Sequence, residues 1–152
     1  MTESVFETFD ETRKAYMQKR RDLLVELERV VTSFHCEFLY DVRTKPMAND
    51  KGNIYIEGFG VGKIGGVWRM YAKISLGGVV FIDAAKGQAK CINVRGGMVL
   101  RSLLEHIEGF LGAIKPSLEL HLQDEEVLIS NAEQALTGFV ARNSLEDTEN
   151  DY

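Results

Sequence analysis

The spacing of glycine constrains the fold of this chain more than any other feature. Eleven of the fourteen glycines lie between Gly52 and Gly97, separated by short runs rich in Val, Ile, Phe and Tyr. The Gly-Gly pairs at 65–66 and 77–78 are typical of two-residue hairpin turns, because glycine takes positive φ without steric cost. A third, slightly longer turn is expected at 85–88. The pattern predicts a four-stranded antiparallel meander over 53–95, with strands at 53–64, 67–76, 79–84 and 89–95.

These turns also set the register of the sheet, and the register decides which side chains share a face. The first loop places the glycines 62, 60 and 58 opposite Arg69, Tyr71 and Lys73. The second loop pairs Ile74 with Phe81, and the third turn pairs Asp83 with Lys90. One face is then the predicted core, formed by Val61, Trp68, Met70, Ala72, Ile74, Leu76, Val79, Phe81, Ile92 and Val94.

The opposite face of the predicted sheet carries polar and cationic side chains, which are Arg69, Tyr71, Lys73, Asn93 and Arg95, with Val80, Ile82 and Cys91 among them. The simpler interpretation is a face that is solvated or covered by the N-terminal helix. The alternative is a groove that binds a single-stranded nucleic acid. In such grooves cations contact phosphates and aromatic rings stack on bases, and the neighbouring glycines would allow the ligand to approach closely.

Helices flank the meander on both sides. Apolar residues at helical spacing predict a long helix over 4–34 and a second helix over 98–114. Alternation of Leu118, Leu120 and Leu122 with polar residues predicts a β-hairpin over 118–129, and a capping box at Ser130 and Glu133 predicts a last helix over 131–142. We expect a single α+β domain over 1–142 and a disordered acidic tail over 143–152.

The N-terminal helix combines a basic segment with a sevenfold apolar repeat. Phe9, Tyr16, Leu23 and Val30 recur every seven residues, which permits a helix–helix dimer. The bases Arg13, Lys14, Arg20 and Arg21 lie either on a solvated helix face or on a second surface that contacts phosphates.

Charge is distributed unevenly along the chain. The net charge of −5 combines −4 for residues 1–12, +7 for residues 13–115 and −8 for residues 116–152. A basic body between acidic ends is a hint of nucleic-acid contact, with an acidic tail that competes for the same surface.

Composition favours a protein of the cytoplasm. No apolar run approaches the length of a membrane span, and the N-terminal residues have no basic region followed by an apolar block, so we expect no signal peptide. The two cysteines, Cys36 and Cys91, favour a reducing compartment over a disulfide scaffold.

Catalytic and cofactor motifs are weak in this chain. Residues 60–65 match G-x-G-x-x-G, but a strand rather than a helix is expected next, which excludes the dinucleotide-binding geometry. His35, His106 and His121 lack metal-ligand spacing. A Cys–His dyad assembled in space from Cys91 and a distant histidine stays open. We expect no metal, no cofactor and no enzymatic activity.

Four antiparallel strands followed by a helix over Met98–Ile114 resemble the element order of PUR-type and whirly-type single-strand-binding domains. The resemblance covers the meander at 53–95 and that helix. It implies that Arg69, Tyr71, Lys73 and Arg95 would contact nucleic acid. The acidic tail, which ends in Tyr152, is similar to the C-terminal tips of some single-strand-binding proteins that recruit partner proteins.

The order of all the elements also resembles the small acidic secretion chaperones of the type III class. That resemblance implies a homodimer that holds an extended client on apolar grooves. The sequence therefore leaves three hypotheses. Single-stranded nucleic-acid binding is the first, a dimeric protein-binding module is the second, and an enzyme with a site assembled from distant residues is the minor third. In the first two cases we expect a homo-oligomer that does not enter a membrane.

Overall fold

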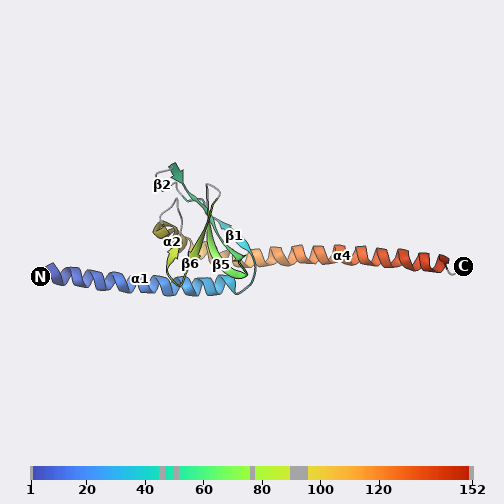
Figure 1. Ribbon diagram of the computed structural model, residues 1–152, viewed down its shortest axis with the longest axis horizontal. Coiled ribbons are helices and arrows are strands. Elements are labelled where there is room, and N and C mark those ends of the chain that lie inside the picture. The colour runs from blue at the N-terminus through green and yellow to red at the C-terminus, as the bar shows by residue number, and fades with distance from the viewer. Residues whose placement is uncertain (1, 45–46, 50–51, 76–77, 90–95, 151–152) are drawn as a thin grey trace. The chain divides into compact units, whose positions relative to one another are not determined.

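The computed structural model describes residues 2–44, 47–49, 52–75, 78–89 and 96–150. The chain divides into two compact units, Met1–Ile114 and Lys115–Tyr152, instead of the predicted single domain over 1–142. The first unit is an α+β domain with an antiparallel sheet, and the second is helical (Figure 1). The predicted α+β class is thus confirmed.

Five antiparallel strands form the main sheet, in the order β1-β4-β5-β6-β7. Their bounds are Phe38–Asp41, Ile56–Ile64, Val67–Ile74, Val79–Asp83 and Gln88–Ala89. A short strand that follows the first helix, β1, lies at the edge of the sheet and pairs with β4. A separate two-stranded ribbon joins β2, Met47–Asn49, to β3, Gly52–Ile54.

The first hairpin has the register that its Gly-Gly turn predicts. Ile64 pairs with Val67, and the glycines 62, 60 and 58 of β4 lie opposite Arg69, Tyr71 and Lys73 of β5. Gly65 and Gly66 have φ of 59° and 80°, which is why the turn requires glycine. The prediction for this hairpin is confirmed.

The register of the second hairpin, β5 with β6, is shifted from the predicted register by an odd number of residues. Tyr71 pairs with Phe81 and Lys73 with Val79, whereas the predicted partner of Phe81 is Ile74. The Ile74 N–H donates to the Gly78 carbonyl at 3.0 Å, so the loop is longer than a two-residue turn. An odd shift moves every side chain of a strand to the other face. The prediction of Val79 and Phe81 as core residues is therefore wrong, and Val80 and Ile82 are buried instead.

The last predicted strand pairing is also different. Asp83 pairs with Gln88 and Ile82 with Ala89, so the four-residue connection is 84–87 instead of the predicted 85–88. The Asp83 carboxylate accepts a hydrogen bond from the Lys86 backbone N–H at 3.1 Å, and this bond closes the turn locally. The predicted partner Lys90 and the rest of the strand at 89–95 that follows Ala89 lie outside the described residues.

Three helices cover one face of the sheet, which we call the inner face. They are α1 (Thr2–Thr32), α2 (Gly96–Glu105) and α3 (Ile107–Gly112). Phe110 of α3 packs against Phe38 of β1 and Phe59 of β4, with ring centroids 5.5 and 6.4 Å apart. The core also takes Leu24, Leu27 and Val31 from α1 and Val99, Leu100 and Leu103 from α2. The predicted helix over 98–114 is present in two pieces, with a break at His106.

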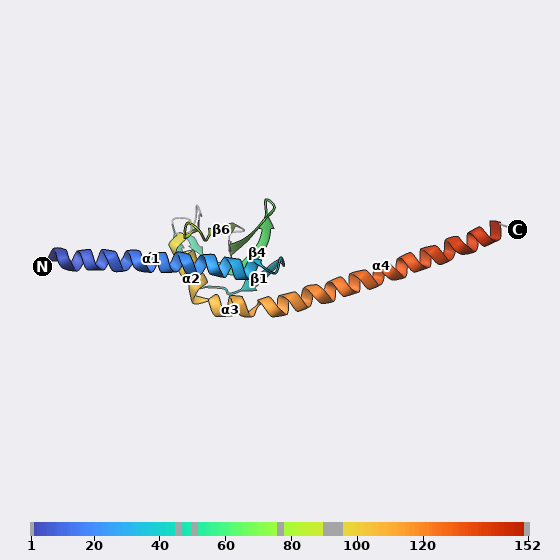
Figure 2. The same ribbon diagram turned by 90° about the horizontal axis from the view of Figure 1, so that it is seen from below.

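Only the C-terminal half of α1 joins this core. The helix extends past the sheet toward its N-terminus (Figures 1 and 2), and the described side chains before Arg20 are exposed. The predicted helix over 4–34 is confirmed to within two residues at each end.

The predicted hairpin over 118–129 is wrong. A single helix, α4, runs from Ile114 to Asn150, so it also contains the predicted helix over 131–142 and most of the tail predicted to be disordered. Every side chain from Glu119 to Ser144 is exposed. Alternating leucines followed by acidic residues fit a helix with apolar side chains around its circumference as well as a strand, because all these residues favour helices. Pro116 lies in the first turn, where proline is tolerated.

Candidate functional site: the outward face of the sheet

The face of the sheet opposite the three helices, which we call the outward face, is open to solvent. The register places Leu39 of β1, Tyr71 and Lys73 of β5, and Val79 and Phe81 of β6 on this face. These side chains line a shallow hollow of about 490 Å³ together with Glu37, Val61, Gly62, Lys63 and Ile64. Because α1 packs on the inner face, the possibility that it covers the predicted site is excluded.

Tyr71 lies across the centre of the outward face. A Cβ atom built on Gly60 would lie 2.4 Å from Tyr71 Cζ and 2.9 Å from the Phe38 carbonyl oxygen. The tyrosine ring therefore occupies the space that the glycine leaves, and this space does not serve the approach of a ligand. Burial raises the pKa of the Tyr71 hydroxyl, and the charge of Glu37 raises it further. Tyr71 is thus a neutral ring that lies over the sheet.

Part of the lining of the hollow is formed by apolar side chains that are exposed to solvent. Val79, Phe81 and Leu39 are 49%, 41% and 37% exposed, although each is a large apolar residue. Phe81 is the cross-strand partner of Tyr71, so two aromatic side chains lie at neighbouring positions. An apolar strip of this kind across several strands is unusual on a solvated face of a sheet, where polar residues are expected.

Among the described residues, positive and negative charges on the outward face are close to balance. Lys73 forms an ion pair with Glu57, at 3.6 Å between Nζ and Oε2. Arg69 is exposed on the same face, where Glu37 and Asp41 contribute negative charge from β1 and its preceding residue. A phosphate chain would meet these carboxylates as well as the cations, so the electrostatic attraction that dominates nucleic-acid affinity is weak here.

The structure brings some of the predicted site residues together and separates others. Arg69, Tyr71 and Lys73 share one face, as predicted. Asn93 and Arg95 lie outside the described residues. None of the helical bases predicted as an extension of this site, Arg13, Lys14, Arg20 and Arg21, lines the hollow of the outward face.

Sequence reasoning missed Val79 and Phe81 as site residues because the second hairpin was assigned a two-residue loop. Leu39 was missed because the pairing of β1 with β4 was not predicted. In the structure β5 ends just before Ser75, whose hydroxyl accepts a hydrogen bond from the Tyr55 N–H at 3.2 Å. A strand that ends at Ile74 gives the longer loop and the observed register.

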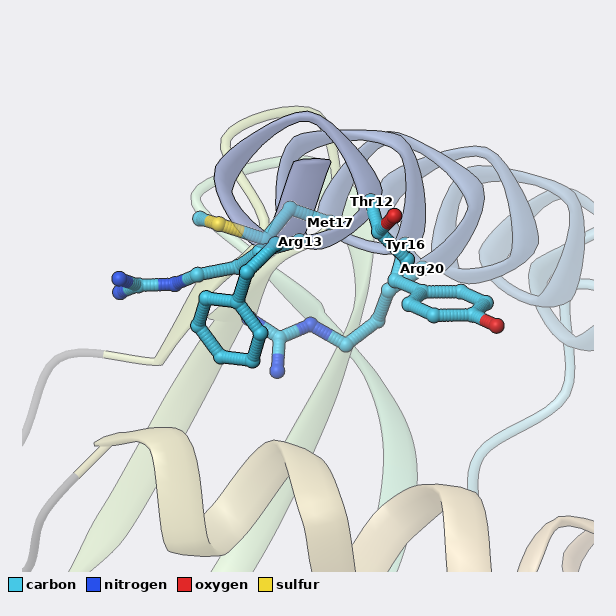
Figure 3. A pocket seen from close by; sticks show the side chains of 6 residues that line it. Thr12, Arg13, Tyr16, Met17 and Arg20 are labelled. Atoms are coloured by element: carbon cyan, nitrogen blue, oxygen red, sulfur yellow. The ribbon is translucent and has the colours of Figure 1, made fainter. Parts of the chain in front are cut away.

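A second hollow, of about 480 Å³, lies on the exposed half of α1. Figure 3 shows Thr12, Arg13, Tyr16, Met17 and Arg20, which line it together with Phe9. Lys19 Nζ lies 5.7 Å from the centre of the Tyr16 ring, a cation–π contact. Arg20 Nε is buried and has no hydrogen-bond partner among the described residues. The predicted basic segment of the helix is therefore interleaved with aromatic and apolar side chains.

The histidines and cysteines form no evident reactive site in the described part of the chain. His106 Nδ1 lies 2.8 Å from the Ser102 carbonyl oxygen, and His35 stacks on Trp68. Cys36 is buried, which raises the pKa of its thiol. Cys91, the proposed member of a Cys–His dyad, lies outside the described residues. Among the described residues, no group of three or more His, Cys, Asp and Glu side chains is placed to hold a metal ion.

None of the helices in the described residues is both long enough and apolar enough to cross a membrane. Comparison of the chain with protein-family models, with curated proteins and with solved structures gives no match.

Proposed function

We propose that this chain is a protein-binding module that holds an extended apolar segment of a partner protein on the outward face. The hollow lined by Leu39, Val79 and Phe81 would take apolar side chains of the partner. Glu37, Lys63 and Lys73 at its margin would contact polar groups of the bound segment. Apolar pockets that take alternate side chains of an extended chain are a general mode of peptide recognition.

The observation that carries this proposal is the register of β6. Val79 and Phe81 face solvent while Val80 and Ile82 fill the core. Since burying a valine or phenylalanine side chain is worth about 1.5–3 kcal/mol, a partner that covers this strip gains apolar contacts that water does not supply. The near balance of charge among the described residues of this face favours a protein over a polyanion as the ligand.

Single-stranded nucleic acid is the second candidate ligand, favoured by the neighbouring pair Tyr71 and Phe81. Two aromatic side chains on adjacent strands can stack on successive bases, with Arg69 and Lys73 near the phosphates. Under this alternative the acidic C-terminal end of the chain would compete with the nucleic acid or recruit a partner protein.

Selection of peptides from a random library on the purified chain tests the proposal. Selected peptides would be measured by fluorescence anisotropy against the wild type, Val79→Asp and the matched control Val67→Asp. Val67 is 52% exposed, close to the exposure of Val79, but does not line the hollow. We expect Val79→Asp to weaken binding by at least about tenfold, or 1.4 kcal/mol, while Val67→Asp leaves it unchanged.

The dependence on salt separates the two candidates. Peptide binding through apolar contacts should change little between low and near-physiological salt, whereas oligonucleotide binding should weaken steeply. Equal affinity of the selected peptides for Val79→Asp and the wild type would overturn the proposal. Steeply salt-dependent binding of a labelled oligothymidylate, lost in Arg69→Glu/Lys73→Glu, would establish the second candidate.

A further inference from the structure

Two exposed helical surfaces of this chain have apolar residues at the same period. On α1, Phe9, Tyr16 and Leu23 recur every seven residues and are 66%, 65% and 45% exposed. On α4, the positions 122, 129 and 136 carry Leu, Ile and Leu at the same interval, also exposed. A sevenfold apolar repeat is the pattern of helices that pack against one another along their length.

Neither of these apolar helix surfaces is packed against the described residues of its own unit. The described side chains of α1 before Arg20 are exposed. The apolar ones among them continue the apolar stripe of the helix, whose later members Leu24, Leu27 and Val31 are buried. The side chains of α4 are exposed from Glu119 to Ser144. Helices derive most of their stability in proteins from packing of an apolar face, and within each unit no described residue buries either surface.

The charged side chains that line a hollow on each of the two helices are opposite in sign. Arg13 and Arg20 line the hollow on α1, with Lys14, Lys19 and Arg21 nearby. The hollow on α4 is lined by Glu125, Glu126 and Glu133 with Leu122, Ile129 and Ser130. Arg13 and Arg20 are seven residues apart, as are Glu126 and Glu133. Among the described residues, none of these four side chains forms an ion pair.

We infer that the partner of these helices is a second copy of this chain, and that the exposed half of α1 in one copy packs against α4 of the other. Pairing the hollow on α1 with its own copy would bring Arg13 and Arg20 against like charges, and pairing the hollow on α4 with its own copy would do the same to Glu126 and Glu133. The charges of the two hollows therefore favour the mixed pair. Two such contacts, related by a two-fold axis, close a dimer without leaving either surface exposed.

Arg13 and Arg20 would then contact Glu126 and Glu133 on either side of an apolar seam. Flanking charges of this kind set the choice of partner in paired helices. The dimer contact does not involve the outward face, and it is independent of the protein-binding function proposed above.

A charge exchange tests the inference in the full-length chain. One variant carries Arg13→Glu and Arg20→Glu, and the other carries Glu126→Lys and Glu133→Lys. By light scattering coupled to gel filtration, the wild type should have twice the mass of one chain and each variant the mass of one chain. An equimolar mixture of the two variants should again have twice that mass, because each interface then joins opposite charges.

The control carries Lys63→Glu and Lys86→Glu, two exposed bases outside both helices, and should remain a dimer. A return of the dimer mass in the mixture shows that both variants are folded. Circular dichroism checks the helix content of each variant alone. A monomeric wild type, dimeric variants, or a mixture that stays monomeric would each overturn the inference. Monomeric variants should still bind the peptides selected on the outward face, which separates the two proposals.

Discussion

At the scale of single residues, two glycines of β4 differ in the space around them. A Cβ at Gly60 would collide with the Tyr71 ring and the Phe38 carbonyl, whereas a Cβ at Gly62 would lie 3.4 Å from Tyr71 Cε1, an ordinary contact. We expect Gly60→Ala to lower the free energy of unfolding by about 1–3 kcal/mol, as overpacking does. Gly62→Ala should change it by less than about 0.5 kcal/mol. Urea denaturation measures both, and equal effects would show that Tyr71 does not lie over Gly60.

Glu28 of α1 connects stability to pH. Burial raises the pKa of its carboxyl above the ordinary 4.5, and a hydrogen bond from the Met70 backbone lowers it in part. The charge of Asp83 raises this pKa and the charge of Arg69 lowers it. The folded chain therefore holds the proton more tightly than the unfolded chain, and the stability contributed by this group is lost as pH rises through the raised pKa. We expect Glu28→Gln to match the wild type below pH 4.5 and to become more stable than the wild type as pH rises to neutral.

The matched control for this effect is Glu26→Gln on the same helix. A hydrogen bond from Arg29 lowers the pKa of Glu26, so its contribution is present at neutral pH and is lost on acidification. Its substitution should have the opposite dependence on pH. Urea denaturation at pH 4 and pH 7 gives the free energy of unfolding of each variant relative to the wild type. If this difference changed with pH in the same direction for both variants, the assignment of burial as the cause of the raised pKa of Glu28 would be wrong.

At the scale of elements, the register of β6 has a direct consequence for stability. Ile82 is 2% exposed and Phe81 is 41% exposed, the reverse of the arrangement that a two-residue turn at 77–78 predicts. We expect Ile82→Ala to lower the free energy of unfolding by about 2–5 kcal/mol. Phe81→Ala, although it removes more atoms, should cost less than about 1 kcal/mol. A larger loss for Phe81→Ala in chemical denaturation would support the predicted register instead.

The two hairpins show how far local sequence determines a sheet. Gly65 and Gly66 are both needed at positive φ, so this turn specifies the register of β4 and β5, and the positions of Arg69, Tyr71 and Lys73 follow from the sequence. The Gly-Gly pair at 77–78 does not by itself determine the register of β6. Val79 to Ile82 are all apolar, so either Val79 and Phe81 or Val80 and Ile82 could form the core. Packing against the helices selects Val80 and Ile82, and this selection requires tertiary contacts that no local pattern contains.

The error at 118–129 has a different physical origin. Leucines at alternate positions fit a half-buried strand, but three such positions are too few to distinguish a strand from a helix. Residues 117–137 contain neither glycine nor proline, so nothing interrupts a helix that begins at Ile114. The sequence therefore indicates the fold class and half of the candidate site, while the apolar residues of that site depend on the register.

At the scale of the whole molecule, the proposed dimer couples stability to protein concentration. A dimer that is more stable than its separated chains dissociates less at high concentration, so its unfolding midpoint rises with concentration. We expect the thermal midpoint of the wild type to increase with protein concentration across about a hundredfold range that spans the dissociation constant. The variant with Arg13→Glu and Arg20→Glu should have a constant midpoint.

Salt identifies which part of the dimer contact provides this stability. Ions at about 1 M screen charges separated by more than roughly 3 Å, so the attraction of Arg13 and Arg20 on α1 for Glu126 and Glu133 on α4 weakens. The apolar repeats at 9, 16 and 23 and at 122, 129 and 136 continue to pack. We therefore expect the dissociation constant from sedimentation equilibrium to increase with salt without complete loss of the dimer. A dimer unaffected by salt would assign the contact to the apolar repeats alone and contradict the role of Arg13 and Arg20 in the choice of partner.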